Sequence, residues 1–169
     1  MEGAPPHLRR MPSKAFTYLY SLISNPVFLA AFFSWFIAQL LKAVIDAVRM
    51  RSRRSRDMVA TIFWKTGGMP SSHASLVTAL ATSLGFGYGL DSPLFTLSLF
   101  YGILVIRDAL GVRRAAGLQA QALNRLGMEL HERFGIRFKP VKEVNGHTAA
   151  EVSVGVLLGF FIATAFSIL

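Results

Sequence analysis

Four long apolar stretches follow one another along the chain, and each is close to the length that crosses a bilayer. They cover residues 26–48, 73–89, 93–110 and 148–169. A helix needs about 20 mostly apolar residues to cross a hydrocarbon core of ~30 Å, and it satisfies its own backbone hydrogen bonds there. The pattern therefore predicts an all-α integral membrane bundle with about four transmembrane helices.

Two further stretches have patterns that suit a membrane surface. Residues 111–134 repeat apolar side chains at every fourth position and place charges on another face, which is typical of an amphipathic helix outside the bilayer. Residues 16–23 carry tyrosines suited to headgroup depth and are expected to be interfacial. The chain thus divides into a basic N-terminal segment, 1–24, that is mobile or interfacial, and a membrane domain, 25–169.

The composition agrees with a membrane protein and excludes several other classes. Hydrophobic residues make up 53% of the 169 residues, and the mean hydropathy of +0.46 is too high for an ordinary soluble domain. The absence of cysteine excludes a disulfide framework and a thiolate metal site. A net charge of +9 suggests nucleic acid in a soluble protein, but beside membrane spans it reflects topology and anionic headgroups. No nucleic-acid partner is therefore expected.

The basic residues are distributed unequally between the two ends of the expected spans. Six Lys and Arg lie in residues 49–65, seven lie in residues 111–147, and none lies in the turn at 90–93. The positive-inside rule then places residues 49–65 and residues 111–147, which include the amphipathic helix, on the cytoplasmic side. Both termini fall on the other side. The basic residues near the N-terminus oppose this orientation unless that segment lies on the membrane surface.

Candidate chemistry begins at residues 67–73, which read Gly-Gly-Met-Pro-Ser-Ser-His between a basic loop and an apolar run. The glycines let the backbone turn, the proline suits a helix start, and Ser71 or Ser72 can serve as N-cap. Unpaired N–H groups and the positive dipole end should then gather at Ser72 and His73, which makes an anion site with an imidazole at its rim. The alternative is a plain loop, a cap and an incidental histidine.

Ionisable side chains in the first span also need an explanation. Lys42, Asp46 and Arg49 fall at i, i+4 and i+7 on one helical face. A charge at such depth costs ~2.5–3.5 kcal/mol or more, so these side chains are expected to face the protein interior. The alternative is that Lys42 and Arg49 snorkel toward the surface with Asp46 as their partner.

The expected topology brings a larger set of polar residues to the same membrane face. His147 should lie in the first turn of the last span, with Glu151 one turn later on the same face. Asp108 ends the third span and is expected to pair with an arginine rather than touch a ligand. Such a cluster of cations repels itself unless an anion joins it, and a phosphate supplies one. The full set is Lys42, Arg49, His73, Asp108, Arg113, Arg114, His147 and Glu151.

Residues 42–50 and 70–73 resemble the first two motifs of the phosphatidic acid phosphatase type 2 superfamily, the membrane lipid phosphatases related to vanadium haloperoxidases. The first motif of that family is Lys, six residues, then Arg-Pro. Lys42 and Arg49 keep this spacing, and Met50 stands in place of the proline. The second motif is Pro-Ser-Gly-His, and residues 70–73 read Pro-Ser-Ser-His.

The third family motif is Ser-Arg, five residues, His, three residues, then Asp. His147 and Glu151 keep the last spacing, with Glu for Asp, while Arg113 or Arg114 must arrive from a distance. The combination resembles the divergent branch of the superfamily, small bacterial and plastid-type membrane proteins, over residues 25–169. The segments that carry this likeness are Gly-Gly-Met-Pro-Ser-Ser-His, Asp108-Ala-Leu-Gly-Val-Arg-Arg, Leu123-Asn124 and Glu143…Gly146-His147-Thr148.

The resemblance implies a metal-free phosphomonoesterase that needs no cofactor. His147 would attack phosphorus in line and form a phosphohistidine, and Glu151 would orient its ring and stabilise the imidazolium. His73 would protonate the leaving alkoxide and then activate water. The residues implied to hold the phosphoryl oxygens are Lys42, Arg49, Ser72, Arg113 and Arg114. The substrate would be a lipid phosphate made at the cytoplasmic face, of the phosphatidylglycerophosphate or phosphatidic acid type.

Three alternatives remain open at the level of sequence. His73, His147 and Glu151 also form a two-histidine, one-carboxylate set, but neighbouring cations disfavour a metal ion there. The departures from the three motifs leave room for a non-catalytic membrane protein that binds anionic lipid phosphates. Four spans make a small bundle, which leaves room for a homodimer that completes the pocket.

Overall fold

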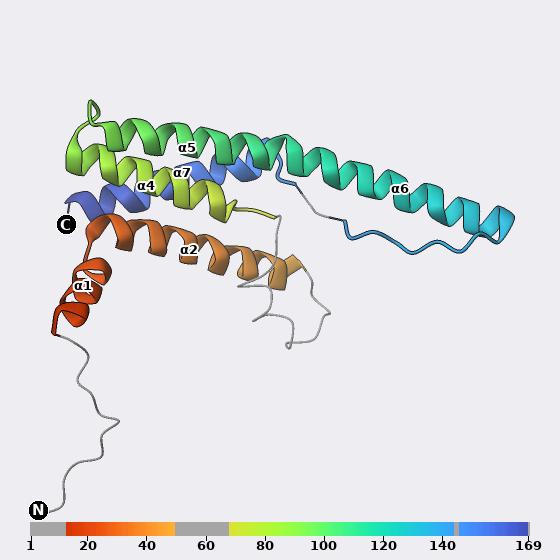
Figure 1. Cartoon of the computed structure of the whole chain (residues 1–169), viewed down its shortest axis with the longest axis horizontal. Helices are drawn as coiled ribbons and strands as arrows, with labels where there is room; N and C mark the ends of the chain where they lie inside the picture. Colours follow the sequence, from red (N-terminus) through yellow and green to blue (C-terminus); the bar gives the residue numbers. More distant parts are fainter. Residues whose placement is uncertain (1–12, 50–67, 144–145, 169) are drawn as a thin grey trace, which may run out of the picture.

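The computed structural model describes residues 13–49, 68–143 and 146–168, and every regular element in these ranges is a helix. Figure 1 shows helices lying side by side in a bundle, with the helix Val112–Phe134 extending beyond it. The prediction of an all-α membrane bundle is confirmed. The helices are α1 (Ser13–Ile23), α2 (Pro26–Arg49), α4 (Ser72–Tyr88), α5 (Pro93–Leu110), α6 (Val112–Phe134) and α7 (Ala149–Ile168).

Helix α4 is the centre of the bundle, because α2, α5 and α7 all pack against it. Among the described residues, three helical segments are long and apolar enough to cross a membrane: Pro26–Val48, Pro93–Phe134 and Ala149–Ile168. Helix α4 has 17 residues, at the short end of the range for a span, and it corresponds to the second of the four stretches expected from the sequence. The most enclosed helix is therefore also the shortest of the four.

Small residues let α4 and α7 approach closely. A Cβ atom added at Gly155 would collide with the carbonyl oxygen of Ser71, and one added at Gly159 would collide with the carbonyl oxygen of Ser75. One turn further along α7, Ala163 is fully buried in the core. Helices in lipid gain little from the hydrophobic effect and associate through such close van der Waals packing. The contact between α4 and α7 is accordingly the most extensive in the bundle.

A buried pair of hydroxyl groups joins α2 to α4. The Oγ atoms of Ser34 and Ser75 lie 2.5 Å apart, and the Ser75 hydroxyl also donates to the Ser34 carbonyl oxygen at 3.3 Å. Both side chains are fully buried. Because Ser75 also lies against Gly159, one turn of α4 fixes the positions of α2 and α7 together.

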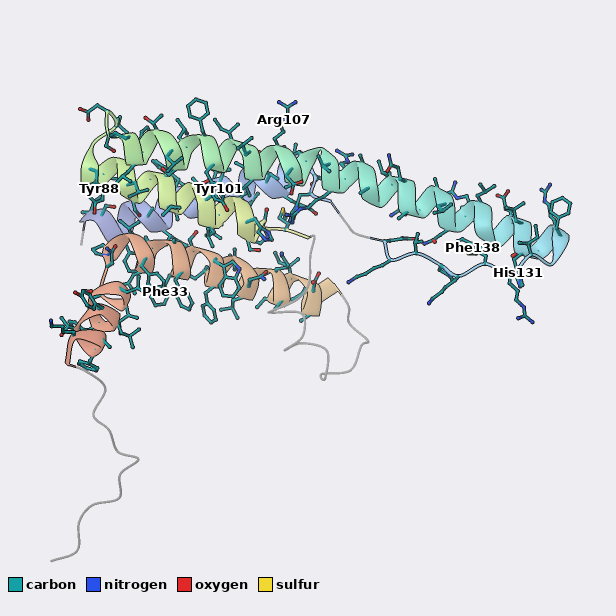
Figure 2. All side chains as sticks on the ribbon, viewed as in Figure 1. Phe33, Tyr88, Tyr101, Arg107, His131 and Phe138 are labelled. Atoms are coloured by element: carbon teal, nitrogen blue, oxygen red, sulfur yellow. The ribbon has the colours of Figure 1, made fainter. Side chains whose placement is uncertain are left out.

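Helix α6 continues from α5 with only Gly111 between them and forms an arm beyond the bundle (Figure 1). Gly135 ends α6 in the left-handed conformation, with φ of 65°. Residues 136–143 then run back along α6 without regular structure, and we call this segment the strap. The ring of Phe138 lies over Gly127, where any side chain would overlap it (Figure 2).

Asn124 of α6 holds the C-terminal end of the strap. Its Oδ1 accepts a hydrogen bond from the Val141 backbone at 2.9 Å, and its Nδ2 donates to the Val141 carbonyl oxygen at 3.0 Å and to Glu143 Oε1 at 2.8 Å. Further along, the backbone of Gly146 lies directly against the backbone of Arg114 at the start of α6. The strap therefore returns the chain from the tip of the arm to the end of the bundle.

Helix α1 lies at the other end of the bundle, away from the arm (Figure 1). Its side chains from Lys14 to Ile23 are exposed, including Phe16, Tyr18 and Tyr20. Aromatic side chains of this type suit the headgroup region, in keeping with the interfacial segment expected there. Residues 1–12 and the basic loop 50–67 lie outside the described residues. The division of the chain into an N-terminal segment, 1–24, and a membrane domain, 25–169, stays a prediction.

Replacement of Gly159 by alanine should separate α4 from α7. The new methyl group meets the rigid backbone of Ser75, so we expect a loss of about 1–3 kcal/mol, the usual cost of overpacking. Gly87→Ala is the matched control, because no atom lies within 4 Å of a Cβ there. Unfolding in mixed micelles with increasing SDS measures both variants. A Gly159→Ala protein as stable as Gly87→Ala would contradict the close packing.

Replacement of Asn124 by alanine should release the strap from α6. Three hydrogen bonds are lost, so opening of the strap should become roughly ten-fold more frequent. Trypsin provides the measurement, since it can cleave after Arg137 and Lys142, which both lie in the strap. The exposed amide of Gln119 on the same helix supplies the control variant, Gln119→Ala. Equal cleavage in both variants would show that Asn124 does not hold the strap.

Candidate functional site

Several segments of the chain converge at the end of the bundle from which the arm projects (Figure 1). They are the C-terminal half of α2, the first turn of α4, the last turn of α5, the first turn of α6 and the residues just before α7. Each brings a polar residue singled out from the sequence. These residues are Lys42, His73, Asp108, Arg113 and His147.

The first turn of α4 is oriented by Ser71. Its Oγ accepts a hydrogen bond from the Ala74 backbone at 3.4 Å, so Ser71 rather than Ser72 is the N-cap. Its own N–H donates to the carbonyl oxygen of Glu151 at 3.0 Å, which fixes this turn to the start of α7. Ser72, the first residue of α4, is buried beside it. The N-terminal N–H groups of a helix have no partner within the helix and favour an anion.

Lys42 is buried in the bundle with 2% of its surface exposed. The stem of its side chain passes Gly68, whose Cβ would lie 3.7 Å from Lys42 Cγ. Gly68 has φ of 87°, a conformation that other residues rarely adopt. The glycine pair seen in the sequence thus provides, through Gly68, a backbone turn that covers a buried cation. The expectation that Lys42 faces the protein interior is confirmed.

His147 is also deeply buried, with 3% of its surface exposed. Its backbone N–H donates to the carbonyl oxygen of Ala109 at 3.2 Å, which attaches the chain before α7 to the end of α5. Neither ring nitrogen has a hydrogen-bond partner among the described residues. A buried polar group without a partner costs about 1–3 kcal/mol, so this ring indicates a role that a ligand would complete.

The surroundings of His147 favour its neutral form. Burial lowers the pKa of the imidazole, the Lys42 charge lowers it further, and His73 and Arg113 add to this effect. The Glu151 carboxylate acts in the opposite direction and raises the pKa. Because the lowering causes prevail, the ring is neutral at pH 7 and one nitrogen carries a free lone pair. That is the form required of a nucleophile.

His73 occupies the first turn of α4 and is more exposed than His147. The charges that act on its ring come from Arg113, Lys42 and Asp108, and two of these also act on His147. The two histidines therefore belong to one electrostatic environment. The His147 side chain is buried, and the His73 side chain is exposed.

Asp108 fixes the position of Arg113. The Nε atom of Arg113 donates to Asp108 Oδ2 at 2.6 Å, so the expected pairing of Asp108 with an arginine is confirmed. The neighbouring Arg107 is exposed and points away from the bundle (Figure 2). A guanidinium has five N–H donors, and this bond uses one of them. Arg113 is thus held in place beside the histidines.

Glu151 makes a contact that the sequence analysis did not anticipate. Its Oε2 accepts a hydrogen bond from the Thr148 backbone at 2.9 Å, and its own N–H donates to Thr148 Oγ1 at 3.3 Å. This reciprocal pair is a capping box, and its Thr-x-x-Glu signature was present in the sequence. The expected bond from Glu151 to the His147 ring is not formed within the described residues. Glu151 acts on that ring through its charge.

Arg114 has surroundings different from those of Arg113. It lines a cavity of about 300 Å³ between the starts of α6 and α7, together with Gly68, Gly146, Thr148 and Glu151. The two arginines are adjacent in the sequence, but Arg113 is bound to Asp108 while Arg114 lines this cavity together with Glu151.

Two of the expected site residues are not placed in the cluster. Arg49 is the last residue of α2, and its side chain lies outside the description. Asp46 lies one turn beyond Lys42 and is partly exposed. Their roles stay predictions. The described residues also contain no group of three or more His, Cys, Asp or Glu side chains placed to share a metal ion.

Comparison with known proteins identifies the family of the chain. The chain matches the family described as the Divergent PAP2 family over residues 23–162. It is also 34% identical over 152 residues to the uncharacterized membrane protein YuiD of Bacillus subtilis (strain 168), which covers 83% of this chain and 93% of that protein. No solved structure matches the chain significantly. The resemblance inferred from the motifs is thus confirmed, and the chain belongs to the divergent PAP2 family of membrane proteins.

Proposed function

We propose that this protein is a membrane phosphatase that removes the phosphate of a lipid phosphomonoester through a phosphohistidine intermediate. The observation that carries the proposal is the buried ring of His147, whose two nitrogens lack partners among the described residues while the cations Lys42 and Arg113 act on it. A neutral nucleophile beside fixed positive charges is suited to an anionic phosphorus centre.

In the proposed first step, a ring nitrogen of His147 attacks phosphorus and the bond from phosphorus to the lipid oxygen breaks. His73 gives its proton to the leaving oxygen, which departs as an alcohol. In the second step a water molecule attacks phosphorus, the bond to nitrogen breaks, and His73 takes the proton of that water. Inorganic phosphate is released, and both histidines return to their starting forms.

The phosphoryl oxygens would be bound by groups that are already oriented. Lys42 is buried, and Arg113 is fixed by Asp108, so neither must be reorganised when charge develops. The N-terminal N–H groups of α4 at Ser72 and His73 add two donors and the positive end of the helix dipole. Arg114 and Arg49 complete the proposed set if the substrate extends toward the 300 Å³ cavity and the end of α2.

A lipid is the proposed substrate because the site lies at one end of a membrane bundle. Its phosphate would remain at headgroup depth while its chains stay in the bilayer. The distribution of Lys and Arg favours the cytoplasmic face, where phosphatidic acid and phosphatidylglycerophosphate are the fitting substrate types. The product would be the corresponding alcohol, which stays in the membrane.

A second function is favoured by one specific observation. The Glu151 carboxylate is engaged with Thr148 and does not orient the His147 ring. A protein without this orienting bond would bind lipid phosphates through the same cations and helix N-terminus without turnover. Binding in the absence of phosphate release separates this alternative from the enzyme.

Phosphate release from lipid phosphates in detergent micelles with EDTA is the direct test. We expect release by the wild type and a loss of at least about 1000-fold in His147→Ala, because the nucleophile is removed. His131→Ala is the matched control, since His131 lies on the arm and its ring bonds only to the Ile136 carbonyl oxygen among the described residues. Trapping of a 32P-labelled, acid-labile phosphoprotein in the wild type would identify the intermediate.

Two outcomes would overturn the proposal. One is equal release by the wild type and His147→Ala. The other is retention of lipid phosphate by the wild type without release of phosphate from any substrate, which would establish the binding protein instead.

Two variants of Glu151 separate its charge from its capping role. Glu151→Gln keeps an acceptor for the Thr148 N–H but removes the charge that raises the pKa of His147. That pKa should fall, so the acidic limb of the kcat/KM profile should move to lower pH while stability is unchanged. Glu151→Ala should show the same displacement and also lose about 1 kcal/mol of stability with the cap. An unmoved acidic limb in both variants would show that Glu151 does not act on His147.

A further inference from the structure

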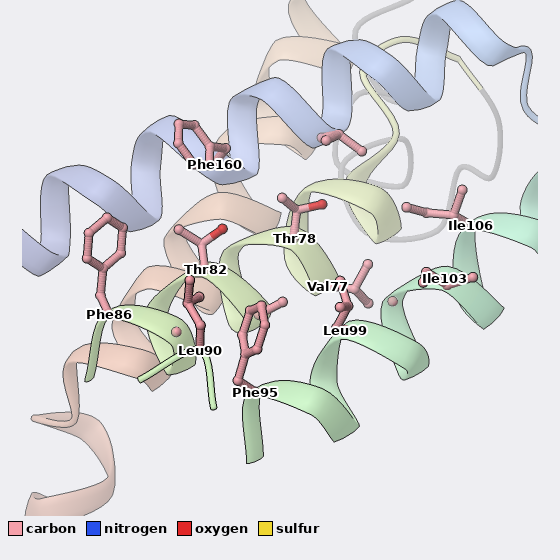
Figure 3. A pocket seen from close by; sticks show the side chains of 14 residues that line it. Val77, Thr78, Thr82, Phe86, Leu90, Phe95, Leu99, Ile103, Ile106 and Phe160 are labelled. Atoms are coloured by element: carbon pink, nitrogen blue, oxygen red, sulfur yellow. The ribbon is translucent and has the colours of Figure 1, made fainter. Parts of the chain in front are cut away.

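A long apolar groove runs along the bundle between α5 and α7, with α4 as its floor (Figure 3). Its volume is about 700 Å³. Thr78 and Thr82 of α4, Leu99 and Ile103 of α5, and Phe160 of α7 are among its lining residues. Apart from the two threonine hydroxyls, these side chains are hydrocarbon. The groove is therefore too apolar to hold ordered water.

The groove exists because α5 and α7 both pack on α4 but barely touch each other. Helix α5 approaches the floor at Gly102, where a Cβ would lie 3.6 Å from the Val77 side chain. Outward from that contact, α5 and α7 form the two separate walls of the groove. Leu99, Ile103 and Phe160 keep 41%, 50% and 44% of their surface exposed, so the groove opens outward between the helices.

The surroundings of this opening determine what can enter it. Both wall helices are long and apolar enough to cross the membrane, so the groove opens to the hydrocarbon of the bilayer. An empty space would forfeit the dispersion contacts of its whole lining. Water is excluded by the apolar walls. A hydrocarbon chain is the remaining occupant.

One end of the groove adjoins the histidine cluster. Its lining includes Val77, one turn after His73 on α4, and Ile106, two residues before Asp108 on α5. The other end is lined by Phe86 at the far end of α4. From His73 to Phe86 the helix rises by ~20 Å. A chain that starts at the cluster can therefore lie along α4 toward the opposite face of the membrane.

We propose that this groove binds one hydrocarbon chain of the lipid whose phosphate occupies the histidine cluster. The inference rests on the proposed function and adds a device that selects substrates by chain length. Transfer from bilayer to groove gains little hydrophobic free energy, because lipid tails are as apolar as the lining. Selection therefore comes from the shape and length of the groove, which a bulky side chain can shorten.

Thr82→Trp shortens the groove at its middle and provides the first test. With this variant we expect kcat/KM for a dipalmitoyl phosphatidic acid to fall roughly ten-fold, and that for a dihexanoyl phosphatidic acid to stay within about two-fold of the wild type. Leu104→Trp is the matched control, since Leu104 is 65% exposed on α5 and does not line the groove. Equal effects of Thr82→Trp on both chain lengths would overturn the groove.

Photo-crosslinking keeps the inference testable if no lipid is hydrolysed. Phosphatidic acid with a diazirine at the end of one chain should label Phe86 and Phe160, with each labelled residue located by peptide fragmentation. A diazirine near the ester should label Val77 and Ile106. Labelling in this order without turnover would support chain binding in the groove and exclude the proposed phosphatase activity. Labelling independent of the diazirine position, or equal at Leu104, would remove the groove.

Discussion

The close approach of α4 and α7 is the constraint on which the rest of the bundle depends. Gly155 and Gly159 let the backbone of α7 lie against the carbonyl oxygens of Ser71 and Ser75. At this separation the Ser71 N–H reaches the Glu151 carbonyl oxygen, so the two helix starts are joined by a backbone hydrogen bond. Each start carries a histidine. The glycines, which have no chemistry of their own, thus decide whether the two imidazoles share one site.

The site concentrates positive charge at one end of the bundle. Lys42 is buried, Arg113 is held by Asp108, and two helix N-termini point to the same region. The acidic groups nearby are already engaged, Asp108 with Arg113 and Glu151 with its own helix start. An anionic ligand would relieve the repulsion and supply the bonds that His147 lacks among the described residues. A neutral ligand would do neither.

Much of the fold could be predicted from the sequence, because hydropathy records the thickness of the bilayer directly. The helix bounds follow the apolar stretches within one residue at most ends, and the motif residues were found from their spacing. The contacts of the arm could not be predicted. The bonds of Asn124 to the strap join segments 17 and 19 residues apart and leave no periodic pattern. The capping box of Thr148 and Glu151 was visible locally, but the family motif suggested another use for the carboxylate. The groove was also hidden, because an apolar side chain facing a groove and one facing lipid look the same in a sequence.

The close contact of Gly155 and Gly159 with α4 also matters for the order in which the helices enter the membrane during synthesis. Helix α4 ends about sixty residues before α7 begins, and until α7 is made the serine-rich face of α4 has no helix to cover it. A nascent chain at that stage holds a short, poorly lipid-compatible span that depends on α2, and then on α5, for shelter. Membrane chaperones or quality-control proteases would meet this intermediate rather than the finished bundle. When α7 packs against α4, it covers the serine-rich face and brings His147 next to the start of α4. The bundle and the site are therefore completed in the same step.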